Sequence, residues 1–343
     1  MIPAPISPAE LFALFAAHPG PEIFGPQSRF PLLVLDLNGA DPALGENLRT
    51  LPCPVIGIGQ GPLATACDVV LPGTEELPTI VAAVDHAPIA AMVLVQHLRA
   101  SEHLELSQAL TAESMAYATV QRGPEFQRWK ANAASTSPNP ETGPPLIMER
   151  EGGTLRLILN RPANLNAIGV ELRDALCDGF DLAAVDSDIE RIELHGAGRC
   201  FSIGGDVCEF GLVGDPATAH WIRSIRLPAR HIIPVADHLN VRIDGAAIGA
   251  GIEIAAFAAR IVAAPTAWFQ LPELKYGLIA GAGGTVSIPR RIGRQRAAYM
   301  MLSMRRIHAA LALRWGLIDA IEPASSSLSA PGGRARAAAS RIG

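Results

Sequence analysis

The chain has 343 residues, of which 49% are hydrophobic and only 18% are charged, a composition that supplies a large apolar core and excludes bulk intrinsic disorder. Its length predicts two domains. The formal net charge of −5 provides no basic surface for nucleic acid or for an anionic membrane.

Residues 1–133 alternate strand-like apolar runs with helical patterns, which is typical of an α/β layer. We therefore predict a small N-terminal α/β domain with a structural role. In chain order, its predicted elements are strands at 31–37, 53–59 and 67–72, a helix at 74–88, a buried strand running into a helix at 89–100, and a helix that begins at the N-cap Thr111 and breaks at Gly123-Pro124.

A linker is predicted at 134–147, because its segment ASTSPNPETGPP is rich in Ser, Thr, Pro and Gly and has no hydrophobic period. Residues 148–325 form the second predicted domain, and the small, polar residues 326–343 predict a disordered tail. The elements predicted between 148 and 245 are strands at 154–160, 191–198 and 240–245, loops at 161–169 and 201–211, a helix at 170–188, and a helix that begins at Asp215-Pro216.

The loop FSIGGD places Gly204 and Gly205 between a strand and a helix-like segment. Adjacent glycines allow close approach of the backbone to a ligand, and exposed N–H groups in such a turn can form half of an oxyanion hole. An ordinary tight turn explains the same residues, so this loop alone does not identify a site.

The stretch GAAIGAGIEIAAFAAR at 245–260 carries one acid, Glu253, among small and apolar residues. We expect Glu253 in the first turn of a helix whose free N–H groups can bind developing negative charge, although a glutamate that only stabilises the helix dipole is the alternative. A second carboxylate, Glu273, follows in a similar glycine-rich context, FQLPELKYGLIAGAGGT. Two carboxylates that flank one substrate can divide the acid and base roles.

Other chemistries find no support in the sequence. No HxxxH pair, P-loop, GxGxxG or GxSxG motif is present. The five irregularly spaced cysteines fit reduced cytosolic thiols better than disulfides or a metal site. The N-terminus has no basic region of a signal peptide, and no apolar run reaches the ~18–20 residues that span a bilayer. We predict a cytoplasmic protein that binds no metal, nucleic acid or membrane.

Together, several motifs resemble the enoyl-CoA hydratase/isomerase (crotonase) family, in the family's order and with compatible spacing, over roughly residues 148–322: RPANLNAIG, FSIGGD, DGAAIGAGIEIA, FQLPELKYGLIAGAGGT, RRIG and IHAALALRWGLID. The resemblance implies a ββα spiral core, a homo-oligomer (trimer or hexamer) and an acyl-CoA thioester as substrate. It implies no separate cofactor, because coenzyme A is part of the substrate.

The resemblance also implies roles for individual residues. The N–H groups of Gly205 and Ala250 would hold the thioester oxygen, Glu253 would help to activate water, and Glu273 would serve at the α-carbon. Ala250 and Ala280 stand where relatives carry Gly and Pro, and Asp244 where they often carry His or Asn. The residues implied along the CoA path are Ala163, Leu165, Asn166, Ala167, Ser202, Ile203, Gly204, Asp206 and Gly249.

Because both acids are retained, we favour a hydratase that adds water to a 2-enoyl-CoA. An enoyl-CoA isomerase, a thioester hydrolase, a cofactor-free oxygenase or a non-catalytic acyl-CoA- or partner-binding subunit stays open. Relatives continue past the GLIDAI motif into C-terminal helices that cover the acyl pocket. We expect residues 1–133, which share the strand–loop–strand rhythm of a degenerate half-copy, to supply this cover.

Overall fold

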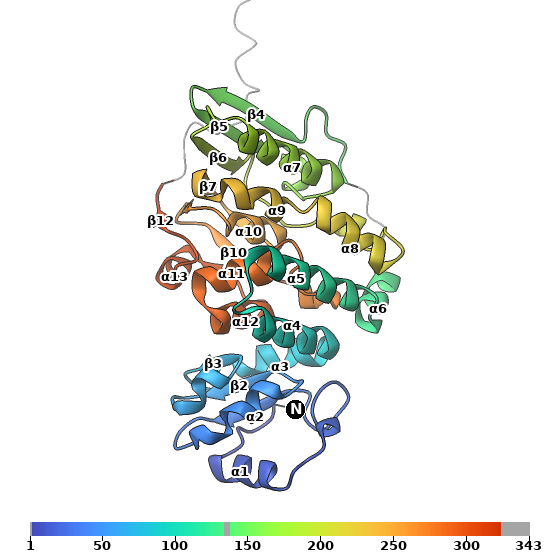
Figure 1. Ribbon diagram of the computed structural model, residues 1–343, viewed down its shortest axis with the longest axis vertical. Coiled ribbons are helices and arrows are strands. Elements are labelled where there is room, and N and C mark those ends of the chain that lie inside the picture. Colours follow the sequence, from blue (N-terminus) through green and yellow to red (C-terminus); the bar gives the residue numbers. More distant parts are fainter. Residues whose placement is uncertain (1, 134–137, 324–343) are drawn as a thin grey trace, which may run out of the picture.

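The structure, a computed structural model, describes residues 2–133 and 138–323 and is a mixed α/β protein, as predicted. Figure 1 shows a small sheet at one end of the molecule and a larger unit with two further sheets above it. The predicted tail at 326–343 and part of the predicted linker lie outside the described residues.

The small sheet is parallel and confirms the three N-terminal strand predictions. Its order is β1 (Leu33–Asp36), β2 (Val55–Ile58) and β3 (Val69–Leu71). Two short helices, α1 (Pro8–Ala16) and α2 (Gly45–Thr50), complete this end of the chain. Its apolar side chains include Leu35, which is fully buried.

Four helices follow the small sheet: α3 (Leu77–His86), α4 (Pro88–Ser101), α5 (Leu106–Gln121) and α6 (Pro124–Asn132). The predicted break at Gly123-Pro124 is confirmed. The strand predicted to open 89–100 is wrong, because its buried residues, such as Ala90, Leu94 and Leu98, follow helical spacing. Thr111 is not an N-cap. It lies within α5, where its hydroxyl donates to the Ser107 carbonyl one turn earlier.

The large sheet has six strands in the order β12-β9-β7-β6-β5-β4, and all its pairs are parallel except β4–β5. The strands predicted at 154–160, 191–198 and 240–245 are confirmed as β5, β6 and β7, and the helix predicted at 170–188 as α7. The element bounds are β4 (Leu146–Glu151), β5 (Thr154–Leu159), α7 (Val170–Val185), β6 (Arg191–Gly196), α8 (Pro216–Ile225), α9 (Pro228–Ile232), β7 (Leu239–Ile243), β9 (Arg260–Ala263) and β12 (Ala320–Ile321).

The third sheet, of order β11-β10-β8, lies beside the short helix that carries Glu253. Helix α8 begins after the N-cap Asp215, as predicted. The remaining elements are β8 (Ala246–Ile248), α10 (Ala250–Ala255), β10 (Trp268–Gln270), η7 (Glu273–Tyr276), α11 (Gly284–Ile292), α12 (Arg294–Ser303), β11 (Ile307–His308) and α13 (Ala309–Trp315).

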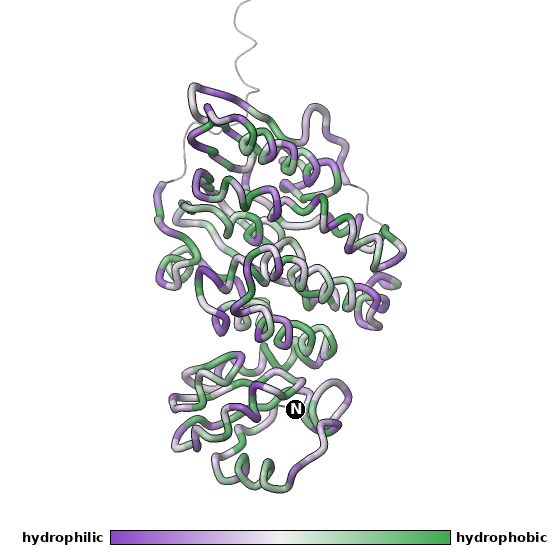
Figure 2. The backbone as a smooth tube through the Cα atoms, viewed as in Figure 1, coloured by the Kyte–Doolittle hydropathy of each residue, from purple (hydrophilic) through white to green (hydrophobic). Residues whose placement is uncertain are grey.

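The N-terminal helices share one hydrophobic core with the larger unit. Buried residues of α4, such as Leu94, belong to the same cluster as Ile252 of α10 and Met300 of α12. Figure 2 shows the largely hydrophobic α4 segment between the small sheet and the rest of the molecule. Helix α5 lies along α8 and α11 (Figure 1), so residues far apart in sequence meet there.

A buried ion cluster also joins the small sheet to helices α4 and α12. Asp68, which is 1% exposed, accepts hydrogen bonds from Arg99 of α4 and Arg294 of α12. Its second oxygen accepts the Val55 N–H at 2.8 Å. A buried carboxylate needs such partners, and the cluster fixes the small sheet against α4 and α12.

Among the described residues, no single helix is both long and apolar enough to cross a membrane. Helices α3 and α4 reach that length only as a pair, and they are bent by 110° at Ala87.

Candidate active site

Two glycine-containing segments, 201–205 and 246–250, run in parallel at the centre of the site. The Ser202 N–H donates to the Ala246 carbonyl at 3.2 Å, and the Ile248 N–H donates to the Ser202 carbonyl at 3.0 Å. A Cβ on Gly204, whose φ is +92°, would lie 2.7 Å from the Ile248 oxygen and 3.4 Å from the Ala250 nitrogen. Only glycine therefore allows the two backbones to approach this closely.

The N–H groups of Gly205 and Ala250 are both available at this junction. Ile168 pairs with the Gly204 carbonyl at 2.8 Å and with the Asp206 N–H at 3.2 Å, so the Gly205 N–H lies on the side away from Ile168. Within the described ranges, neither the Gly205 nor the Ala250 N–H has an acceptor. Two such donors are what an oxyanion requires.

The two predicted carboxylates converge on Gly249, the residue before Ala250. A Cβ on Gly249 would lie 2.8 Å from Glu273 Oε1 and 3.9 Å from Glu253 Oε1. Gly249 has φ +48° and ψ −127°, a conformation that suits glycine. The structure thus brings together the two glutamates and one of the two donors that the sequence predicted.

Glu253 is held firmly in its place. It lies in the first turn of α10 and is 2% exposed. Its Oε2 accepts the N–H groups of Ala282 at 2.7 Å and Gly284 at 2.9 Å. Burial raises the pKa of Glu253 to about 7, while the two N–H donors oppose that rise by stabilising the carboxylate. Glu253 is therefore not a surface glutamate that only stabilises the helix dipole.

Glu273 has a different environment, at the start of η7. Its Oε2 is buried and has no hydrogen-bond partner in the described part of the chain. Burial, followed by the charge of Glu253, raises the pKa of Glu273 well above its usual value. Two nearby buried carboxyls cannot both ionise easily, so their proximity favours the protonated form of Glu273.

Asn166 and Ser202 brace the loop that carries Gly205. Asn166 is fully buried, and its amide nitrogen donates to the carbonyls of Ala197, Cys200 and Phe201 at 2.9–3.1 Å. The Ser202 hydroxyl donates to the Asn166 carbonyl at 2.7 Å and accepts the Gly204 N–H at 3.1 Å. Both side chains are occupied within the chain, so any contact with CoA here would use the backbone around them.

The other residues predicted along the CoA path lie on the loops 161–169 and 201–211, except Gly249, which lies on the 246–250 segment. Leu165 has φ +55° and ends the turn η4 (Pro162–Asn164), which contains Ala163. Ile203 is 37% exposed. The Asp206 carboxylate accepts the Cys208 N–H and caps a short turn. The CoA-binding roles of these residues, of Ala167 and of the glycines stay predictions.

Sequence reasoning missed two residues that the N-terminal region brings to this site. Glu113 of α5 accepts N–H groups from the loop that holds Glu253, and Tyr117 lies one turn later on the same helix. In the sequence, Glu113 is one polar residue of a helical pattern, and nothing there links it to Glu253. Its burial depends on a partner 170 residues away.

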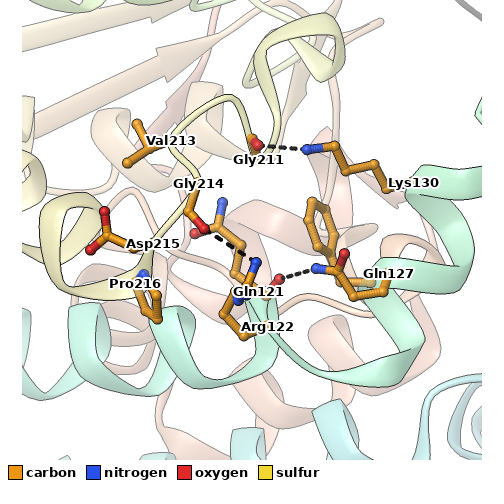
Figure 3. A pocket seen from close by; sticks show the side chains of 10 residues that line it. Gln121, Arg122, Gln127, Lys130, Gly211, Val213, Gly214, Asp215 and Pro216 are labelled. Atoms are coloured by element: carbon orange, nitrogen blue, oxygen red, sulfur yellow. Dashed lines mark hydrogen bonds between the residues drawn. The ribbon is translucent and has the colours of Figure 1, made fainter.

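The turn between α5 and α6 is tied to the loop that follows the Gly205 segment. Figure 3 shows Lys130 Nζ donating to the Gly211 carbonyl at 2.6 Å and Arg122 to the Gly214 carbonyl at 3.2 Å, around a small pocket. Trp129 of α6 packs against both Phe210 and Tyr276, with ring centroids 6.2 and 5.1 Å apart. The N-terminal helices therefore contact both the loop that follows Gly205 and the turn that carries Glu273.

In the part of the chain that the structure describes, no group of three or more His, Cys, Asp or Glu side chains could hold a metal ion.

Comparisons with known proteins point in one direction. A family model described as enoyl-CoA hydratase/isomerase matches residues 149–338. A 2,3-dehydroadipyl-CoA hydratase of Escherichia coli is 35% identical over 183 residues, which cover 53% of this chain and 71% of that protein. A protein of Mycobacterium bovis described as a probable enoyl-CoA hydratase is 31% identical, with coverages of 57% and 74%. A solved structure of an enoyl-CoA hydratase/isomerase from Marinobacter aquaeolei is 27% identical, with a TM-score of 0.47 and coverages of 52% and 71%.

Proposed function

Because the chain belongs to the enoyl-CoA hydratase/isomerase family, we propose that it is a lyase that adds water to the double bond of a 2-enoyl-CoA thioester. The observation that carries this proposal is the convergence of Glu253 and Glu273 at Gly249, directly before the free N–H of Ala250. No separate cofactor takes part, since coenzyme A belongs to the substrate.

In the proposed reaction, the N–H groups of Gly205 and Ala250 bind the thioester oxygen. Glu253 takes a proton from water, and the water oxygen forms a bond to the β-carbon. The electron pair of the double bond moves onto the thioester as an enolate, whose charge the two N–H groups stabilise. Glu273 then gives its proton to the α-carbon, so that one water molecule is added in total.

The environments of the two acids support this division of roles. Glu253 accepts two backbone N–H groups, which favour its ionised form, as a base requires. Glu273 has an oxygen without a partner and a neighbouring charge, which favour its protonated form, as an acid requires.

Hydration of crotonyl-CoA, followed as loss of the enoyl absorbance, tests the proposal. We expect Glu253→Gln and Glu273→Gln each to lower kcat by about 10²–10⁴-fold, the usual contribution of a general acid or base. The exposed Glu149→Gln is the matched control and should leave kcat unchanged. Full turnover in both active-site variants would rule out the hydratase mechanism, and isomerisation of a 3-enoyl-CoA without hydration would favour an isomerase.

As part of the same proposal, we expect a cytoplasmic homo-oligomer, a trimer or hexamer. Four cysteines, Cys53, Cys67, Cys177 and Cys200, are buried free thiols, which fits a reducing compartment. Helix α8 exposes the apolar side chains of Trp221 and Ile225, which suits burial between subunits. Light scattering of the purified protein tests the oligomeric state, and a monomer would contradict it.

A further inference from the structure

Four successive backbone N–H groups at the start of α11 alternate between two glutamates. Those of Ala282 and Gly284 donate to Glu253, at 2.7 and 2.9 Å. Those of Gly283 and Thr285 donate to Glu113 of α5, at 2.8 and 2.9 Å. One short loop is thus held between a carboxylate of the active site and a carboxylate of the N-terminal region.

Glu113 is completely buried and sits in a chain of polar groups. The Thr285 hydroxyl donates to Glu113 Oε2 at 2.6 Å, and Nε2 of His97 on α4 lies 2.8 Å from the same hydroxyl. Burial lowers the pKa of His97 to about 4, so this imidazole is neutral at physiological pH and adds no charge. Helices α4 and α5 therefore hold the loop through two side chains, His97 and Glu113, of which only Glu113 can be ionised near neutral pH.

Tyr117 covers the beginning of the same loop. A Cβ on Gly281 would lie 2.2 Å from the Tyr117 ring, so the ring packs directly on this glycine. The Arg223 guanidinium of α8 covers the ring at 4.8 Å from its centroid. Burial raises the pKa of the Tyr117 phenol above its usual range; the Arg223 charge opposes that rise, and the charges of Glu253, Glu273 and Glu113 add to it.

The charge of Glu253 also acts on Glu113. Burial raises the pKa of Glu113 to about 8, and the charge of Glu253 adds to that rise. The titratable and charged groups that face Glu113 across the elements packed around it are Glu253, Glu273, Tyr117, His97, Arg223 and Arg230.

We infer that Glu113 is a positioning residue of the active site: it holds the Gly281–Thr285 loop so that Ala282 and Gly284 present their N–H groups to Glu253. Helix α5 of the N-terminal region is then part of the catalytic machinery as well as its cover. The inference rests on the proposed function for its kinetic consequence, and on the loop geometry alone for its effect on Glu253.

The test is Glu113→Gln in the full-length protein, with crotonyl-CoA as substrate. The amide that replaces the carboxyl cannot accept through both of its terminal atoms, as the carboxyl accepts Gly283 and Thr285, so the loop loosens and the N–H groups of Ala282 and Gly284 stabilise the Glu253 carboxylate less. We expect kcat to fall by about tenfold or more with KM within threefold, and the acid limb of the pH profile to move by at least half a unit to higher pH. A purely structural role would lower stability without moving that limb.

Glu125→Gln is the matched control. Glu125 is also a buried glutamate of the N-terminal helices, and it accepts two backbone N–H groups, those of Ile89 and Ala90 at the start of α4. It should lose stability while keeping the wild-type pH profile. If Glu113→Gln fails to fold, Glu113→Asp replaces it. That variant is one methylene shorter and cannot reach both N–H groups, so kcat should fall and the acid limb should again move to higher pH, and a wild-type kcat would overturn the inference.

Infrared titration of the protonated-carboxyl stretch separates this inference from the proposed function. The component that is lost in Glu253→Gln belongs to Glu253, and in Glu113→Gln it should titrate at higher pH. This readout holds even if Glu253→Gln keeps full turnover and the hydratase proposal fails. An unshifted Glu253 signal together with an unshifted acid limb would overturn the inference.

Discussion

Glu253 and Glu273 both lie beside Gly249, but their carboxyl groups differ in hydrogen bonding. Glu253 sits in a helix, and two backbone N–H groups fix one of its oxygens. Glu273 sits in a short turn, and one of its oxygens is buried without a partner among the described residues. The comparison teaches that the surroundings, and not the residue type, set how easily each carboxyl ionises, which is what the proposed base and acid roles require.

The largest effect should come from displacing the held carboxylate without touching its chemistry. A Cβ on Gly284 would lie 2.5 Å from Glu253 Cγ and 2.8 Å from Cδ, so Gly284→Ala must push the Glu253 side chain aside. We expect kcat for crotonyl-CoA to fall about 10²-fold, since small misplacements of catalytic groups have effects of this size. Steady-state kinetics measure it.

Gly214→Ala is the control for that substitution, because a Cβ there meets nothing within 4 Å. It should retain wild-type kinetics. Equal activity in the two alanine variants would show that the position of Glu253 does not matter.

Stability should respond to the two acids with opposite signs. Glu253→Met leaves the N–H groups of Ala282 and Gly284 without an acceptor, and we expect a loss of about 2–4 kcal/mol in the free energy of unfolding. Glu273→Met removes an unpartnered buried oxygen and should change it by less than about 1 kcal/mol, or raise it. Denaturant unfolding at pH 7 measures both variants. Equal losses in the free energy of unfolding would contradict the difference in hydrogen bonding between Glu253 and Glu273.

A smaller effect should appear as a pH dependence of stability. Burial raises the pKa of Glu253 to about 7 and of Glu113 to about 8, so between pH 6.5 and 8 the folded state binds more protons than the unfolded state. Stability from these groups is therefore present at low pH and is lost as pH rises through their folded pKa values. We expect Tm to fall by a few degrees over this window; His97, with a folded pKa of about 4, opposes this fall only below about pH 7, where its unfolded imidazole still binds protons.

The Glu113→Gln variant sharpens that measurement, because it removes one of the titrating carboxyls. Its Tm should fall less between pH 6.5 and 8 than that of the wild type. Differential scanning calorimetry provides the comparison, and a Tm that rises with pH in the wild type would contradict the assignment of raised pKa values.

Local patterns predicted much of the fold and the centre of the site. The three strands of the small sheet, the glycines that bring segments 201–205 and 246–250 together, and Glu253 in the first turn of a helix all follow from short-range sequence. Each depends on apolar alternation or on glycine conformation, and both are properties of neighbouring residues.

What sequence did not predict depends on distant partners. Helix α5 begins at Leu106 and not at Thr111, because Ala109 and Leu110 bury against Leu227 and Val286 of other elements. Likewise, α4 is apolar enough for a strand, and only its burial on several sides shows why a helix can be so hydrophobic. Glu113 was missed for the same reason.

The hydrogen bonds between Glu113 and the α11 loop have a consequence for the order in which the protein folds. The two partners are separated by 170 and 172 residues, so this contact closes a very long loop of chain. Contacts of such separation form late, after local helices and hairpins. During synthesis, Glu113 leaves the ribosome before the residues whose N–H groups it accepts, Gly283 and Thr285, have been made. We therefore expect Glu113 to gain these hydrogen-bond partners late in folding, once the second half of the chain has been made.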